Sequence, residues 1–102
     1  MGITYIEGTV TGPLGSRSLK FLVDSGATYT LLPYDDWRAI GLESKRSLSF
    51  VLADGSPIER QISECHIALS MGDGHSPVIL GEPGDEALLG VVTLENLGLV
   101  FN

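Results

Sequence analysis

The stretch FLVDSGATYTLLP, residues 21–33, contains the side chain best suited to chemistry, the carboxylate of Asp24. Apolar residues precede and follow it, and a carboxylate in apolar surroundings is costly unless something pairs with it. Asp-Ser-Gly alone also fits a turn, in which Asp accepts local backbone N–H groups and Gly supplies the angle. Two features favour a functional site. One apolar strand leads into the tripeptide and another follows it, and Leu88-Leu89-Gly90 provides a second close-packing glycine.

Other reactive residues lack the surroundings that chemistry would need. Cys65 and His66 are adjacent in a predicted strand, so their side chains point to opposite faces, and with His75 they lack the spacing of metal ligands. The sequence shows no positively charged surroundings for Cys65, which favours a small buried residue over a nucleophile. The glycine-rich turns lack the spacing of a phosphate loop. We therefore expect no metal and no cofactor.

Composition limits the classes of function. A chain of 102 residues has room for one domain, residues 1–102, and a net charge of −7 argues against nucleic acid as a partner. A single cysteine fits a reducing compartment. The N-terminus lacks the pattern of a signal peptide, and no segment approaches the roughly 20 apolar residues of a membrane helix. These features predict a cytoplasmic domain without a membrane partner, possible also as a piece excised from a larger chain.

Short apolar runs between turn residues predict a mostly β domain with seven or eight strands and two short helices. Asp54-Gly55 is the turn signal of a long hairpin, and Pro57 predicts that this hairpin lies at a sheet edge. Tyr34, Trp37 and Ile40, spaced by three, would face the core from a helix. The predicted elements are strands over 3–11, 18–24, 27–33, 78–80 and 99–102, a hairpin over 48–69, helices over 33–42 and 91–97, and turns or loops over 12–17, 71–77 and 81–86.

Four segments together resemble the retropepsins, the single-lobed aspartic proteases of retroviruses and their cellular relatives. They are LVDSGATYTLLP, the ADGS hairpin tip, PVILGEPG and ALLGVVTLENLGLVFN. They span nearly the whole chain in the family's order and spacing. The resemblance implies a closed, barrel-like lobe with a flap hairpin, assembled as a two-fold symmetric homodimer.

The resemblance also implies where the partner of Asp24 lies. Peptide hydrolysis by an aspartic protease needs two carboxylates that share one proton. No other acidic residue of the chain lies in an Asp-Ser-Gly sequence. The partner is then Asp24 of a second copy, because a two-fold axis brings identical residues together. In the family pattern Ser25 bonds across the axis to the other loop, and Gly26 lets its N–H approach the carboxylate.

Further positions are substrate-binding by the same resemblance. The hairpin over 48–65 matches the flap, with Ala53, Asp54 and Gly55 at its tip. Leu22 and Leu88 match positions that line side-chain pockets, and Ala27 and Thr28 follow the catalytic motif. Because Ala27 has no hydroxyl to bond the outer carboxylate oxygen, we expect the dyad to ionise at higher pH than in relatives with a hydroxyl there.

The sequence departs from the viral pattern in two ways. Viral members carry Arg after the apolar-apolar-Gly segment and an Asp in the catalytic loop, where this chain has Val91 and Thr28, so both halves of an ionic brace are absent. Little sequence precedes the first predicted strand. We therefore expect residues 99–102 and the Ser25 loops to form much of a dimer interface.

The resulting expectation is an aspartic endopeptidase that binds a peptide or protein substrate as an extended strand. One alternative is a catalytically weak dimerisation or peptide-binding module on the same fold, because function depends on the site and not the fold. Another is an unrelated small barrel that binds a ligand, which predicts a monomer.

Overall fold

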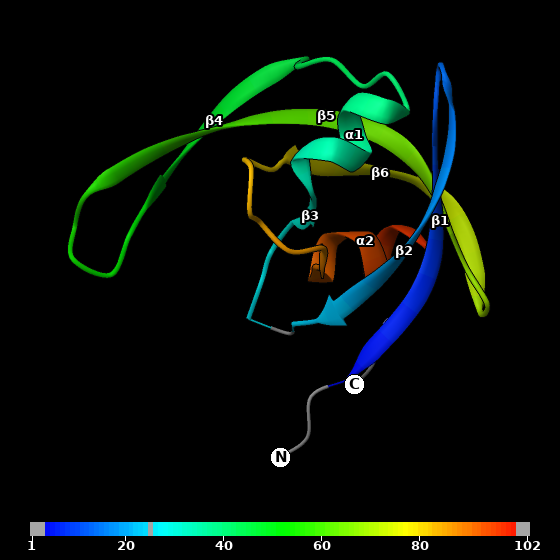
Figure 1. The fold of residues 1–102 in the computed structure, drawn as a ribbon. Coiled ribbons are helices and arrows are strands. Elements are labelled where there is room, and N and C mark those ends of the chain that lie inside the picture. The colour runs from blue at the N-terminus through cyan, green and yellow to red at the C-terminus, as the bar shows by residue number, and fades with distance from the viewer. Residues whose placement is uncertain (1–3, 25, 100–102) are drawn as a thin grey trace.

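Residues 4–24 and 26–99 are described by the computed structural model, and they form seven strands and two short helices (Figure 1). The strands are β1 (Tyr5–Gly12), β2 (Gly15–Val23), β3 (Thr30–Leu32), β4 (Arg46–Val51), β5 (Pro57–Leu69), β6 (Gly72–Leu80) and β7 (Leu88–Leu89), and the helices are α1 (Tyr34–Ala39) and α2 (Val91–Asn96). The predicted class, mostly β with two short helices, is confirmed.

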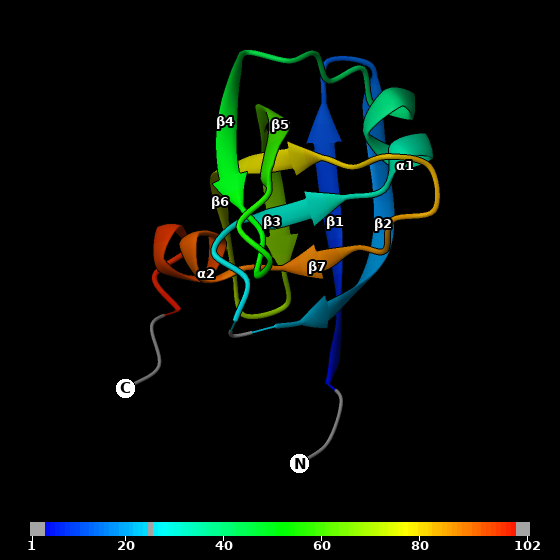
Figure 2. The same cartoon turned by 90° about the vertical axis from the view of Figure 1, so that its left-hand side faces the viewer.

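The strands form one sheet in the order β1-β2-β7-β3-β6-β5-β4. Strand β1 also pairs antiparallel with β5, with Gly8 opposite Leu69 and Thr11 opposite His66, so the sheet curls round and closes into a barrel (Figure 2). Strand β4 lies outside the closed part and pairs with β5 alone. The closed, barrel-like lobe expected from the sequence is confirmed.

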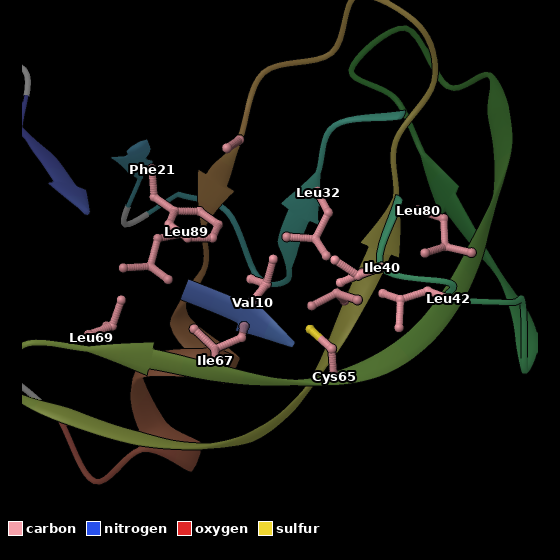
Figure 3. Packing of buried hydrophobic residues seen from close by; sticks show 12 residues of the cluster. Val10, Phe21, Leu32, Ile40, Leu42, Cys65, Ile67, Leu69, Leu80 and Leu89 are labelled. Carbon is pink, nitrogen blue, oxygen red and sulfur yellow. The ribbon is translucent and has the colours of Figure 1, made fainter. Parts of the chain in front are cut away.

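Alternation along the strands fills the inside of the barrel. Strand β5 buries Cys65, Ile67 and Leu69 at every second position, as expected where one face of a strand covers a core. Figure 3 shows these side chains pointing toward others from β1, β2, β3 and β7. Full burial of an aliphatic or aromatic side chain contributes about 1.5–3 kcal/mol. Among the described residues, the apolar ones with no exposed surface are Val10, Phe21, Leu32, Ile67, Val78 and Leu89.

Both predicted helices are present but shorter than expected, since α1 covers 34–39 within the predicted 33–42 and α2 covers 91–96 within the predicted 91–97. Helix α1 follows Pro33, has Asp35 and Asp36 in its first turn, and is followed by Gly41 at a φ of +79°. Trp37 and Ile40 pack against the core as expected, whereas Tyr34, for which the same was predicted, is half-buried and packs edge-on against Trp37. Helix α2 covers 91–96, and Gly98 after it has a φ of +76°. Neither helix of the described chain is long and apolar enough to cross a membrane.

Two predicted turns are too long. The predicted turn over 12–17 is only Pro13-Leu14, because β2 already begins at Gly15. The predicted turn over 71–77 is wrong from Gly72 onward, because residues 72–77 belong to β6 and only Met71 lies in the turn. Its glycines indicate a turn locally, but residues 72–77 all pair with β5, and these ladder hydrogen bonds override the local preference.

The predicted strand over 27–33 is shorter in the structure, and a strand was missed. Only residues 30–32 form β3, since the backbone of the preceding loop bonds to α2 instead of a neighbouring strand. Leu88–Leu89 forms β7, which pairs with both β2 and β3. The predicted strand over 99–102 lies largely outside the described residues.

The predicted long hairpin is confirmed as β4 and β5, and Figure 1 shows it projecting from the barrel. Its turn is longer than the two residues that Asp54-Gly55 predicted. Leu52 and Ser56 are bonded across a three-residue loop, in which Gly55 has a φ of +88°. Such a loop typically has a glycine in the left-handed region at its last position. Pro57 starts β5 where its neighbour is β4 alone, the predicted edge position.

Candidate active site

Asp24 lies directly after β2, at the point where the parallel pair of β2 and β7 ends. Val23 is the partner of Leu89 in this pair, and the Asp24 N–H donates to the Leu89 carbonyl at 3.3 Å. The Ala27 N–H donates to the Asp24 carbonyl at 3.0 Å and closes a four-residue turn. The side chain of Asp24 is exposed in the single chain. The end of β2, beyond the buried Phe21, therefore places this carboxylate at the surface at a defined position.

Gly26 contacts this carboxylate through its backbone. Its N–H donates to Asp24 Oδ1 at 2.9 Å, and a Cβ on Gly26 would lie 3.3 Å from the same oxygen. Its φ is not in the left-handed region, so space for the carboxylate and not an unusual backbone angle is what glycine provides here. The expected approach of the Gly26 N–H is present. Ser25 lies outside the described residues, so its expected bond across an axis remains a prediction.

Helix α2 holds the loop that follows. The N–H groups of Val91 and Val92, at the start of the helix, donate to the carbonyls of Ala27 and Thr28 at 3.0 and 2.9 Å. Gly90 packs directly on this loop, since a Cβ there would lie 2.4 Å from the carbonyl carbon of Tyr29. The close-packing role expected for Gly90 is present. Val91 and Thr28 take part in this contact through their backbone N–H and carbonyl groups, and neither side chain carries a charge.

Leu22 and Leu88, predicted to line pockets, are neighbours in the sheet. Leu22 is opposite Leu88 in the parallel pair, and Leu88 is opposite Leu31 of β3. All three are half-buried, whereas Leu32 and Leu89, which follow Leu31 and Leu88, are fully buried. The three leucines form an apolar row beside Asp24. Leu31 was missed from the sequence, although a strand alternates its faces, so one of Leu31 and Leu32 had to point away from the core.

Ala53, Asp54 and Gly55 lie together at the exposed tip of the β4–β5 hairpin. Hydrogen bonds from Ser56, first from its side chain and then from its backbone, hold the pKa of Asp54 below its ordinary value. Just before the tip, Val51 and Leu52 leave 76% and 48% of their surfaces exposed. The tip therefore presents apolar side chains and one charge to solvent.

The hairpin and the 26–29 loop meet through two aromatic rings. Tyr29, at the end of the loop, packs edge-on against Phe50 of β4, with ring centroids 6.2 Å apart. Views at right angles show the hairpin extending on the side of the barrel where the 26–29 loop lies (Figures 1 and 2). The structure thus brings the β4–β5 hairpin and the 26–29 loop into contact at Phe50 and Tyr29.

Cys65 and His66, for which the sequence favoured neither a metal site nor a nucleophile, lie on β5. Cys65 is buried in the core, and burial raises the pKa of its thiol to about 12. His66 points to the outer face, where its Nε2 lies 2.8 Å from Asp73 Oδ2. The described residues contain no group of three or more acidic, histidine or cysteine side chains arranged to hold a metal ion.

The family model described as "gag-polyprotein putative aspartyl protease" matches residues 10–96. The chain belongs to this aspartyl protease family. The match includes the Asp24 loop, the whole β4–β5 hairpin and α2, which are the three parts of the candidate site.

The fold is that of a retroviral protease. The solution structure of Simian Foamy Virus (mac) protease matches with a TM-score of 0.67 and 18% sequence identity, over 97% of this chain and 100% of that chain. No curated protein sequence matches this chain significantly. Family and fold together support protease function, and the expected retropepsin-like class is confirmed.

Proposed function

We propose that this aspartyl protease is an endopeptidase active as a homodimer, in which the Asp24 carboxylates of two copies form the catalytic dyad. The observation that carries the proposal is the exposed Asp24 carboxylate in the family's motif, which accepts a hydrogen bond from the Gly26 N–H. The reaction needs two adjacent carboxylates. Several other acids of the chain are paired elsewhere. These pairs are Asp36 with Arg17, Glu82 and Asp85 with Arg60, and Asp73 with His66.

The two Asp24 carboxylates have different roles because they share one proton. The ionised Asp24 takes a proton from a water held between the two carboxylates, and that water attacks the peptide carbonyl carbon. The protonated Asp24 of the second copy donates its proton to the carbonyl oxygen as the tetrahedral species forms. Because like charges about 3 Å apart cannot both ionise, the dyad titrates as a unit.

The surroundings of Asp24 suit an extended peptide. The apolar row of Leu22, Leu31 and Leu88 offers a wall for apolar substrate side chains, and the peptide backbone can add to sheet edges by strand pairing. We assign the β4–β5 hairpin as the flap that closes over the peptide. Closure would cover the exposed Val51 and Leu52 and exclude water from the reaction.

The test compares Asp24→Asn with Asp35→Asn, which neutralises an exposed carboxylate at the start of α1. Purified proteins are incubated with a diverse peptide mixture from pH 4 to 8, and new termini are identified by mass spectrometry. We expect Asp24→Asn to lose cleavage by at least about a thousandfold, since members of a catalytic unit are rarely dispensable. Asp35→Asn should cleave normally, and both should sediment as dimers.

Two results would contradict the proposal. One is cleavage by Asp24→Asn at the rate of Asp35→Asn. The other is a protein that stays monomeric at high concentration with a bound peptide inhibitor. Retention of peptide binding in the absence of any cleavage by the unaltered chain would favour the binding-module alternative.

A further inference from the structure

Three buried hydroxyl groups form a continuous chain beneath the catalytic loop. Thr30 of β3, Thr93 of α2 and Ser76 of β6 are 0%, 0% and 2% exposed. The Oγ1 atoms of Thr30 and Thr93 lie 2.5 Å apart, and Thr93 Oγ1 lies 2.8 Å from Ser76 Oγ. The two ends are backbone groups. The Gly90 N–H donates to Thr30 Oγ1 at 3.0 Å, and Ser76 Oγ donates to the Pro77 carbonyl at 3.1 Å.

The two backbone ends determine the direction of every hydrogen bond in this chain, which we call the hydroxyl relay. The Gly90 N–H can only donate, and the Pro77 carbonyl can only accept. The Ser76 hydroxyl donates to the Pro77 carbonyl, so its oxygen accepts a hydrogen bond from the Thr93 hydroxyl. The Thr93 oxygen in turn accepts from the Thr30 hydroxyl. Each hydroxyl then donates once and accepts once. The reverse direction would leave the Thr30 proton without an acceptor in the relay, which is costly in a buried site.

The relay ends at the backbone that positions Asp24. The carbonyl of Leu89, next to Gly90, accepts the Asp24 N–H. The N–H groups of Val91 and Val92 donate to the carbonyls of Ala27 and Thr28. The segment over 89–92 therefore bonds to both sides of the catalytic turn, and the relay attaches that segment to β3 and β6 in the barrel wall.

We propose that Thr93 is a positioning residue for catalysis, acting through the hydroxyl relay that holds the 89–92 segment against the catalytic loop. The inference rests on the proposed function for its kinetic consequence. Val91 and Thr28 cannot form an ion pair between helix and loop, so the neutral relay supplies the side-chain attachment at this junction. Thr93 occupies the middle of the relay, and its loss breaks the connection on both sides.

The experiment compares Thr93→Val, which keeps the shape and removes the hydroxyl, with Thr93→Ser, which keeps the hydroxyl. Thr9→Val on β1 serves as a control for a threonine outside the relay. A small displacement of catalytic groups lowers kcat more than substrate binding. We expect Thr93→Val to lower kcat by about tenfold or more with KM changed less than about twofold, and Thr93→Ser to stay within about twofold of the unaltered chain.

Hydrogen exchange provides a readout that does not depend on activity. In Thr93→Val the amides of Gly90, Val91 and Val92 should exchange about tenfold faster, because removing one buried partner leaves the others unsatisfied. Amides of β1 should be unchanged. If Thr93→Val does not fold, Ser76→Ala removes the last hydroxyl of the relay and should give the same pattern.

The proposal is wrong if Thr93→Val leaves kcat and these amides unchanged, or if Thr93→Ser loses as much as Thr93→Val. Lack of cleavage by the unaltered chain would instead contradict the proposed endopeptidase, and the exchange rates would still decide whether the relay holds the loop. The two failures are therefore distinguishable.

Discussion

Gly90→Ala gives the sharpest test of how the loop that follows Asp24 is held. A Cβ at this position would lie 2.4 Å from the carbonyl carbon of Tyr29, 2.6 Å from its oxygen and 2.8 Å from the Thr28 oxygen. These atoms belong to the backbone and cannot rotate away, unlike the end of a flexible side chain. The loop, the helix or both must shift to accommodate one methyl group.

The magnitude follows from two opposing effects. Overpacking a well-packed site costs about 1–3 kcal/mol, and three backbone contacts place Gly90 at the upper end. Replacing glycine also restricts the unfolded chain, which returns about 0.4–1 kcal/mol. The net loss is about 2 kcal/mol in the free energy of unfolding, equivalent to about 8–16 °C in Tm for a domain of this size.

The assay is urea unfolding followed by the fluorescence of Trp37, the only tryptophan, whose indole N–H donates to the Gly81 carbonyl at 2.8 Å. Protein concentration is held constant, because association makes apparent stability depend on it. Gly72→Ala is the matched control. Its Cβ would meet nothing nearer than 3.5 Å, and its φ is outside the left-handed region. Equal unfolding midpoints for the two variants would refute the close packing of Gly90 on the loop.

Two further predictions concern pH. Ala27→Thr adds a hydroxyl beside the dyad that favours its charged form, so the acid limb of the pH–rate profile should move to lower pH. Ala27→Val is the control of similar shape, and an equal shift in both variants would exclude the hydroxyl as the cause. Burial raises the pKa of the Cys65 thiol from 9.0 to about 12. As the pH rises above 9, this thiol therefore ionises in the unfolded chain but not in the folded one. The free energy of unfolding should therefore fall by roughly 1 kcal/mol from Cys65 between pH 8 and 10, and urea titrations of Cys65→Ala should lack this part of the decrease.

Much of the site could be predicted because its signals are local. The Asp24 motif, the hairpin turn and the Pro33 and Gly98 helix boundaries each depend on residues within one turn or one strand. The turn length was wrong because Asp54-Gly55 fits two kinds of loop, and only the pairing of Leu52 with Ser56 distinguishes them.

The rest required contacts between distant segments. The glycine-rich residues 72–75 became strand because β5 was available to pair with them, and β7 exists because two strands flank it. The assignment of Leu31 to the outer face and Leu32 to the core depended on the register of β3. None of these choices is visible within a local window, because the hydrogen-bond partners are far along the chain.

The sequence by itself determined the family, the acidic residue at the candidate site and the order of the elements other than β7, since these are encoded in contiguous motifs. Tertiary structure alone decided the closure of β1 on β5, the row of Leu22, Leu31 and Leu88, and the hydroxyl relay. Thr30 and Thr93 are 63 residues apart in the chain, yet their oxygens lie 2.5 Å apart. Such a bond exists because barrel closure removes both hydroxyls from water and leaves them each other as partners.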